Sequence, residues 1–398
     1  MGAMQDINLA SPEMLFAPYP LLAQLRAHPT LIKAAPLDAY LVSRYDDVLA
    51  VLKDPQRYSS EALQSIGEPP WLGRNYLSQA MVSVDPPRHT KLRALVNRAF
   101  GPSALARLER LIRSRAEEFA AAAVEQGEVD FVDAFSIQLP RAVIGHLLGL
   151  EPATFPKMKR WSTAMATVTT AFTPEEQEEI RAAFREMEGE LRQVIAARRS
   201  NPGDDMVSDL VRAEVDGQVL TDDDLLSFLF LLLPAGMETT THLLGNAAVL
   251  LARHPEELER TRQDRSYLPL FIEEVLRFES PVRAAYRLAA VDVELSGTRI
   301  PAGSIVVPLL CSANRDERVF PDADRFRPSR EKAGQVLAFG YGIHFCVGAS
   351  LARMETRYGL EALLPRIKEI RLSTPEVSWL PSLAVRGPQT LPVQLIRA

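Results

Sequence analysis

A glycine-rich segment around one cysteine constrains this chain more than any other feature. Residues 339–348 hold Cys346 among glycines at positions 340, 342 and 348. Glycine lets the backbone pass where a Cβ would clash, either in a left-handed turn or against a flat ligand. Residues 349–355 have a helical pattern, so Cys346 should lie at a helix N-terminus. At that position the unpaired N–H groups and the helix dipole stabilise a thiolate.

Three roles are open to such a cysteine. A thiolate in a mostly apolar loop suits the axial ligand of a haem iron, onto which it pushes electron density. A lone cysteine is more often a buried structural residue, and it can also act as a nucleophile. The neighbouring glycines, together with Phe339 and His344, favour the haem ligand over both alternatives.

Residues 339–348 resemble the haem-binding loop of the cytochrome P-450 family, whose pattern is Phe-x-x-Gly-x-His/Arg-x-Cys-x-Gly. The resemblance to that fold extends over nearly all of the chain. It implies a mainly α fold with a smaller β-rich portion, forming a single domain over residues 1–398. It also implies haem b as cofactor, with Cys346 as the axial ligand of the iron. The haem would lie between a long central helix and the helix after the cysteine loop.

The bulk composition fits an ordinary globular protein, with 47% hydrophobic and 24% charged residues. A net charge of −6 argues against nucleic-acid binding by the molecule as a whole. The chain begins without a signal-peptide pattern, and its longest apolar run, near residues 228–233, is far shorter than a bilayer of about 30 Å requires. Two cysteines far apart in the sequence indicate a reducing compartment. We therefore expect a cytoplasmic protein without a membrane anchor. The family resemblance implies an enzyme of the soluble bacterial type, which we expect to act as a monomer.

Hydrophobic periodicity predicts helices over most of the chain. A capping-box pattern at Thr221 begins a long helix that ends near His254, and prolines interrupt the helical pattern at residues 102, 152, 156 and 174. Alternating patterns with turn residues predict strands, with a short hairpin over residues 30–45 and a turn at Ser296 and Gly297 within residues 287–308. The predicted helical regions are residues 99–199, 221–254 and 269–278, and the predicted strand regions are residues 30–45, 287–308 and 379–393.

An acid and a hydroxyl follow one another in the middle of the long apolar helix, at Glu238 and Thr239. Pro234 removes a backbone donor and Thr239 can bond a carbonyl one turn earlier, so the helix should loosen here. A carboxyl in such surroundings is costly unless it is paired. On these residues alone, a helix kink with solvated polar groups is the simpler interpretation. They match the family pattern Ala/Gly-Gly-x-Asp/Glu-Thr-Thr/Ser, which implies that both relay protons to the oxygen being activated.

Glu274 and Arg277 lie three residues apart and therefore on one helical face. Such pairs are common on protein surfaces and contribute little there. In the family, a Glu–Arg–Arg cluster holds the loop that carries the thiolate. The resemblance implies that Glu274, Arg277 and Arg325 form this cluster, as structural support and not as catalysts.

The two propionates of a haem need cations or strong hydrogen-bond donors. His89 and Arg93 lie four residues apart after a proline pair and share a helical face. On an exposed helix such residues are normally just solvated. The resemblance implies that both bind propionates, together with Arg287 and His344.

By resemblance, a mainly aliphatic pocket receives the substrate, which suits a hydrophobic organic molecule. Arg283 is the exception, because it could hold a substrate carboxylate or turn outward into solvent. Trp71, Trp161 and Phe172 are the candidate aromatic contributors. The expected pocket residues are Leu231, Leu232, Ala235, Val282, Arg283 and Leu383.

The implied activity is a monooxygenase that inserts one oxygen atom of O2 by hydroxylation or epoxidation. Electrons would come from NAD(P)H through a separate reductase and ferredoxin. A peroxide-driven peroxygenase of the same fold is one alternative, but such relatives typically lack the acid–threonine pair. A non-catalytic haem sensor is another, although simple binding needs no proton relay. The basic residues expected to dock an acidic ferredoxin are Arg88, Lys91, Arg98, Arg353 and Arg357.

Overall fold

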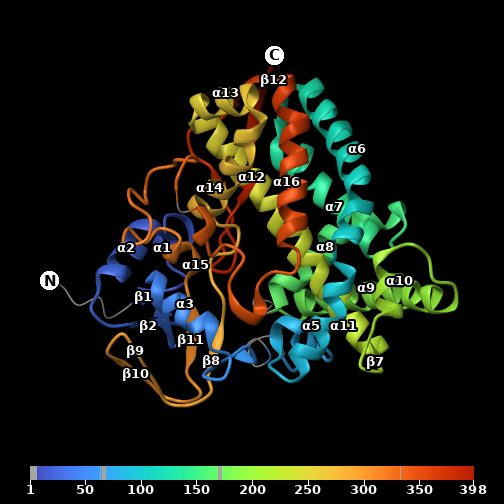
Figure 1. The fold of residues 1–398 in the computed structure, drawn as a ribbon, viewed down its shortest axis with the longest axis vertical. Coiled ribbons are helices and arrows are strands. Elements are labelled where there is room, and N and C mark those ends of the chain that lie inside the picture. Colours follow the sequence, from blue (N-terminus) through green and yellow to red (C-terminus); the bar gives the residue numbers. More distant parts are fainter. Residues whose placement is uncertain (1–6, 63, 65–68, 169–172, 332) are drawn as a thin grey trace. The chain divides into compact units, whose positions relative to one another are not determined.

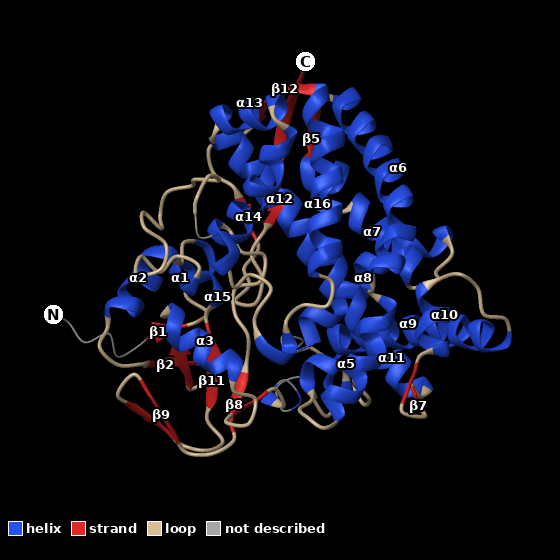
Figure 2. Ribbon diagram, in the orientation of Figure 1, coloured by secondary structure: helices blue, strands red, loops and turns tan. Residues whose placement is uncertain are grey.

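The computed structural model describes residues 7–62, 64, 69–168, 173–331 and 333–398. Helices form most of the regular structure, and strands form a smaller portion (Figure 2). The chain divides into two compact units, each built from several chain segments. The first unit contains residues 1–59, 116–136 and 239–398, and the second contains residues 60–115 and 137–238.

A mixed sheet of six strands organises the N-terminal part of the first unit (Figure 1). Its strand order is β1-β2-β3-β11-β8-β4. The pair β2 and β3 is antiparallel, which confirms the hairpin predicted over residues 30–45, whereas β3 and β11 run parallel. The strands are β1 (Ile7–Asn8), β2 (Ile32–Ala35), β3 (Ala39–Val42), β4 (Tyr58–Ser59), β8 (Arg287–Ala289) and β11 (Ile305–Pro308).

Smaller sheets complete the β-rich portion of this unit. The predicted turn at residues 296 and 297 joins β9 (Val293–Leu295) to β10 (Thr298–Ile300). Ser296 and Gly297 both have positive φ, as a two-residue hairpin turn requires. The remaining strands are β5 (Glu128–Asp130), β12 (Ile367–Leu372) and β15 (Pro392–Arg397) in one sheet, and β13 (Ser378–Trp379) with β14 (Pro388–Thr390) in another.

Three helices form the core that supports the cysteine loop in the first unit: α12 (Thr239–Arg253), α14 (Leu268–Phe278) and α16 (Ala349–Leu363). They contact one another and lie side by side in Figure 1. Residues 240–251 of α12 are all buried, which explains their apolar sequence. The other helices of the unit are α1 (Pro12–Phe16), α2 (Tyr19–Ala27), α3 (Tyr45–Lys53), α13 (Pro255–Gln263) and α15 (Leu310–Ala313).

Helices form most of the regular structure described in the second unit. The prolines at which the sequence predicts interruptions lie at or close to the beginnings of helical segments, where a missing N–H costs nothing. A short hairpin of β6 (Glu214–Val215) and β7 (Gln218–Val219) follows α10. The α-helices with bounds among the described residues are α5 (Arg88–Ala99), α7 (Gln138–Leu147), α8 (Phe155–Thr167), α9 (Pro174–Ser200), α10 (Met206–Arg212), α11 (Asp222–Leu232) and the first part of α6 (Pro102–Gln126).

The predicted long helix begins and ends as expected but is not uniform. Thr221 and Asp224 form the capping box at the start of α11. After Leu232 the chain makes a π-helical turn, Leu233–Glu238, and then continues as α12 to Arg253. The loosening predicted at Pro234 is therefore a widened turn and not a break. Among the described residues, no helix is both long and apolar enough to cross a membrane.

Candidate functional site

The cysteine loop is held by backbone contacts that only glycine permits. Gly340 and Gly342 have φ of 70° and 72°. A Cβ at position 342 would lie 2.4 Å from the carbonyl oxygen of Leu52, so no larger residue fits. The N–H of Cys346 donates to the carbonyl of Phe339 at 3.0 Å, which closes the loop. Gly348 is the N-cap of α16, and Cys346 thus lies just before a helix N-terminus, as predicted.

The two cysteines differ in accessibility. Cys311 is 2% exposed and packs in a hydrophobic cluster with residues of the N-terminal helices and strands. Cys346 is exposed, and the two do not form a disulfide. Cys346 is therefore the thiol that a large planar ligand can reach.

Beside the loop, the surface of the first unit is hollowed. The hollow has a volume of about 450 Å³ and is lined by Tyr45, residues 334–337 and the cysteine-loop residues 340–342 and 345. Tyr341 and Phe345 are 44% and 42% exposed. The loop therefore presents two aromatic rings at the surface.

Glu274 on α14 is buried and forms the centre of an ion-pair cluster. Arg277 donates to both of its carboxylate oxygens, at 2.8 and 2.7 Å. The Arg277 guanidinium also donates to the carbonyls of Asn314 and Ala323. The predicted pair is thus present, and it ties α14 to the irregular chain that leads toward the cysteine loop.

The third member of this cluster is Arg330, and the prediction of Arg325 was wrong. Arg330 is buried and its Nε lies 3.3 Å from Oε2 of Glu274. The side chain of Arg325 is exposed, and only its backbone carbonyl takes part, accepting from Arg277 at 3.2 Å and Arg330 at 2.9 Å. Both arginines follow Phe320 in a loop without periodicity, so spacing alone could not choose between them.

A second ion pair links α14 to the helix after the loop. Glu273, next to Glu274, pairs with Arg353 on α16 at 2.5 Å. The Arg353 guanidinium lies 4.4 Å from the ring centroid of Phe339, the first residue of the cysteine loop. One helix thus supports the chain on both sides of Cys346.

Four donors were predicted to bind haem propionates, and they come from both units. In the first, Arg287 is buried on β8 and His344 is half-buried beside Cys346. In the second, His89 is buried and Arg93 half-buried, one turn apart on α5. Burial lowers the pKa of His89, and Arg93 lowers it further. A neutral imidazole of this kind still donates a hydrogen bond.

The acid of the predicted relay has a partner that the sequence did not indicate. Glu238 ends the π-helical turn, and the Ser162 hydroxyl on α8 donates to its Oε1 at 2.5 Å. Burial raises the pKa of Glu238, while this hydrogen bond acts in the opposite direction. Thr239 is the first residue of α12. Ser162 lies 76 residues before Glu238, and no local pattern connects them.

The expected pocket residues differ in accessibility. In the second unit Leu232 is buried, Leu231 half-buried and Ala235 exposed. In the first unit Val282 and Leu383 are half-buried.

Of the two alternatives considered for Arg283, a substrate carboxylate or solvent, the second is wrong. Arg283 is 2% exposed, and its guanidinium donates to the backbone carbonyls of Met14, Leu15 and Ser382. Buried main-chain carbonyls need such donors, so both terminal nitrogens of the guanidinium already donate to the backbone.

Two of the three aromatic candidates lie in the described residues. Trp161 is buried and donates from Nε1 to Glu186 at 2.8 Å. Trp71 is half-buried beneath Arg181. Phe172 lies outside the described residues.

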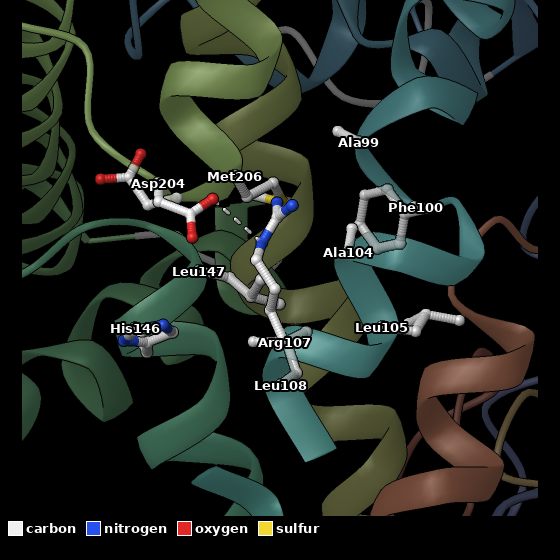
Figure 3. A pocket seen from close by; sticks show the side chains of 11 residues that line it. Ala99, Phe100, Ala104, Leu105, Arg107, Leu108, His146, Leu147, Asp204 and Met206 are labelled. Atoms are coloured by element: carbon white, nitrogen blue, oxygen red, sulfur yellow. Dashed lines mark ion pairs between the residues drawn. The ribbon is translucent and has the colours of Figure 1, made fainter. Parts of the chain in front are cut away.

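A small cavity in the second unit does not suit an organic substrate (Figure 3). Its volume is about 30 Å³, whereas ligand pockets usually measure about 300 Å³ or more. Arg107 extends across it toward Asp204, with an Nε–Oδ1 distance of 3.4 Å. The cavity has room for about one water molecule.

The donor chemistry fits haem b. The first unit offers one exposed thiol in a loop that tolerates no Cβ at position 342, and the other cysteine is buried. Arg287 and His344 in the first unit, and His89 and Arg93 in the second, are the donor types that carboxylates require. A thiolate ligand with cationic and neutral donors for propionates matches this cofactor.

Comparisons with known proteins agree with this chemistry. The family model described as cytochrome P-450 matches residues 150–376. The chain is 38% identical to the cytochrome P-450 monooxygenase PikC of Streptomyces venezuelae, over 98% of this chain and 94% of that protein. It is 37% identical to the 6-deoxyerythronolide B hydroxylase of Saccharopolyspora erythraea, over 95% and 96%. Among solved structures, cytochrome P-450 CYP109Q5 of Chondromyces apiculatus is 40% identical, with a TM-score of 0.91 over the full length of both chains.

The corrected cluster leads to a stability prediction. Arg330→Ala should lower the free energy of unfolding by about 3 kcal/mol, because it removes a buried partner of the Glu274 carboxylate. Arg325→Ala keeps the backbone carbonyl that the cluster uses and should cost less than about 0.5 kcal/mol. Urea unfolding followed by circular dichroism measures both. Equal losses for the two variants would contradict the assignment of Arg330.

Proposed function

The chain belongs to the cytochrome P-450 family, and on that premise we propose that it hydroxylates or epoxidises an uncharged hydrophobic molecule, using electrons from a separate ferredoxin. The family makes haem b its cofactor and oxygen incorporation from O2 its reaction class. The observation that carries the proposal is an exposed thiol in a glycine-held loop, together with an acid–threonine pair in a widened helical turn. We propose a single functional domain that acts as a monomer.

Each predicted site residue takes a role in this proposal. Cys346 would hold the haem iron through its thiolate. Arg287, His344, His89 and Arg93 would bind the propionates of the haem. The bound haem supplies the oxygen activation, and the chain supplies the ligand, the enclosure and the path for protons.

Glu238 and Thr239 form the proton path in this proposal. A carboxyl whose pKa is raised by burial can accept and release a proton closer to neutral pH than an exposed one. The π-helical turn displaces the backbone from regular helical geometry at this point. The Thr239 hydroxyl, next in sequence, would hold the water that passes the proton onward.

The substrate class follows from the expected wall residues. Leu231, Leu232, Val282 and Leu383 are aliphatic, and the terminal nitrogens of Arg283 already donate to backbone carbonyls, which disfavours Arg283 as the anchor of a substrate carboxylate. We therefore favour uncharged molecules such as macrolides or steroids over fatty acids. The relative from Saccharopolyspora erythraea is named for a reaction on 6-deoxyerythronolide B. Shifts of the haem Soret band across a ligand library test this choice, and a preference for fatty acids would oppose it.

Loss of the Thr239 hydroxyl should separate electron use from product formation. We expect Thr239→Ala to bind haem and substrate like wild type and to keep consuming NADPH. Product per NADPH should fall about tenfold or more, with the electrons appearing as hydrogen peroxide, because proton delivery fails. Glu238→Gln should instead slow the whole cycle, since it removes an ionisable group. The measurement is the ratio of product to NADPH to peroxide at saturating substrate and ferredoxin.

The neighbouring Thr240 provides a matched control, because it is buried and lies one residue further along α12. Thr240→Ala removes a hydroxyl one residue away and should leave the product ratio unchanged. If Thr239→Ala also leaves it unchanged, protons reach the oxygen by another route and the relay must be withdrawn.

The ion pairs among the described residues indicate which of the five basic residues are best suited to dock a ferredoxin. Lys91 and Arg98 are exposed, seven residues apart and on one face of α5, and neither forms an ion pair with a described residue. Arg353 and Arg357 already pair with Glu273 and Glu361. Arg88 pairs with an aspartate of α11. Lys91 and Arg98 therefore present the least compensated charge to an acidic partner.

Reversing these two charges should weaken ferredoxin binding. We expect Lys91→Glu with Arg98→Glu to raise the Kd about tenfold or more at low ionic strength, and the difference from wild type should shrink as salt is added. Lys368→Glu on β12 changes another exposed lysine and should have little effect. A wild-type affinity that does not depend on salt, or an equal loss with Lys368→Glu, would rule out docking on this face.

A further inference from the structure

The hydrogen bond between Ser162 and Glu238 connects two elements of the second unit. Ser162 is 1% exposed on α8, and its Oγ donates to Oε1 of Glu238 at 2.5 Å. A hydrogen bond to a carboxylate is among the stronger ones in a protein interior. Its direction holds the Glu238 carboxyl toward α8.

The π-helical turn that carries Glu238 packs tightly against its neighbours. Both α7 and α8 contact the turn Leu233–Glu238. A Cβ at Gly236 would lie 2.3 Å from Cδ1 of Ile144 on α7, so a larger residue there would have to displace the Ile144 side chain. With α7 packed against the turn, α8 supplies the polar contact to the carboxyl.

The helix that carries Ser162 is itself joined to α9 by polar contacts. Trp161, the preceding residue, donates from Nε1 to Glu186 at 2.8 Å. Lys157 donates to Glu190 at 3.1 Å, and Arg160 pairs with Glu186. Displacement of α9 should therefore displace α8, and with it the hydroxyl that contacts Glu238.

The contacts continue from α9 to the segment before α5. The Tyr76 hydroxyl donates to Glu188 at 2.7 Å, and Arg181 donates to the backbone carbonyl of Trp71 at 3.1 Å. A connected series of side chains thus runs from residues 71–76 through α9 and α8 to the acid. A series of contacts can transmit a structural change only if one of its elements adopts two distinct positions. Here α8 is the element whose position matters, because it carries Ser162.

We propose that Ser162 is a positioning residue, through which α8 holds the Glu238 carboxyl and controls when it can take part in proton delivery. With the hydroxyl in place, the carboxyl is held toward α8. When α8 moves away, the carboxyl loses its donor and is free to turn. This inference rests on the proposed relay role of Glu238.

Within the described residues, charged groups do not compete with this hydrogen bond. The elements that pack on the turn carry Arg141 and His146 on α7, Lys157, Lys159 and Arg160 on α8, and three aspartates on α11. None of them contributes to the pKa shift of Glu238, whose causes are burial, which raises it, and Ser162, which lowers it. Removing the hydroxyl should therefore raise the pKa of Glu238.

Infrared difference spectroscopy on the haem-loaded full chain tests the proposal without turnover. The C=O band of protonated Glu238 is identified by its loss in Glu238→Gln, and its titration midpoint is followed with pH. In Ser162→Ala the midpoint should rise by about one pH unit, the effect of one hydrogen bond to a charged group. Ser162→Thr should restore it. Ser114→Ala removes an exposed helical hydroxyl on α6 and should leave it unchanged.

The outcomes separate this inference from the proposed function. A midpoint in Ser162→Ala equal to that of wild type would overturn the positioning role, even if Glu238→Gln slows turnover. A raised midpoint in Ser162→Ala together with full activity of Glu238→Gln would support the hydrogen bond but refute the relay role of Glu238. The proposed control of proton delivery by Ser162 would then be refuted as well. Support requires a raised midpoint, slower turnover in Glu238→Gln, and a lower product-to-NADPH ratio in Ser162→Ala that the threonine variant restores.

Discussion

The buried carboxylate of Glu274 is the interaction on which the position of the cysteine loop depends. Burying charge costs several kcal/mol unless each group is paired, and here Arg277 and Arg330 pair with the carboxylate while their remaining donors bind backbone carbonyls of the irregular chain after α15. That chain has little regular structure, so side chains must satisfy its carbonyls. Asn314 then accepts from the N–H of Leu337, close to where the cysteine loop begins. The neighbouring Glu273 holds α16 on the other side of the loop.

The segment that carries Glu238 and Thr239 is held in a different way from the cysteine loop. Where the cysteine loop is held from both sides, the long helix is loosened by Pro234 into a π-helical turn, a form found frequently at functional sites. The carboxyl of Glu238 depends on one hydroxyl from another helix, and burial keeps its pKa high. The cysteine loop thus has polar partners on both of its sides, whereas one hydrogen bond from α8 contacts the Glu238 carboxyl.

The features that were predicted correctly from the sequence are those determined by interactions between residues close together in the chain. The capping box at Thr221, the turn at Gly297 and the glycine-dependent cysteine loop are each specified within a few residues, and the structure confirms them. Which side chains pair with one another over long distances in the sequence could not be predicted from the sequence. Arg330 and Arg325 are both arginines in one loop, and burial alone distinguishes them. The placement of Ser162 against Glu238 likewise depends on packing between helices far apart in the sequence, which leaves no periodic signal.

Ligation of the haem iron by Cys346 is the central claim, and the carbon monoxide difference spectrum of the reduced protein tests it most directly. Wild type and Cys311→Ser should both show the red-shifted band that a thiolate ligand produces, because Cys311 is buried in a hydrophobic cluster. Cys346→Ser should lose this band while the chain remains folded by circular dichroism. A thiolate band that persists in Cys346→Ser, or disappears in Cys311→Ser instead, would contradict the account.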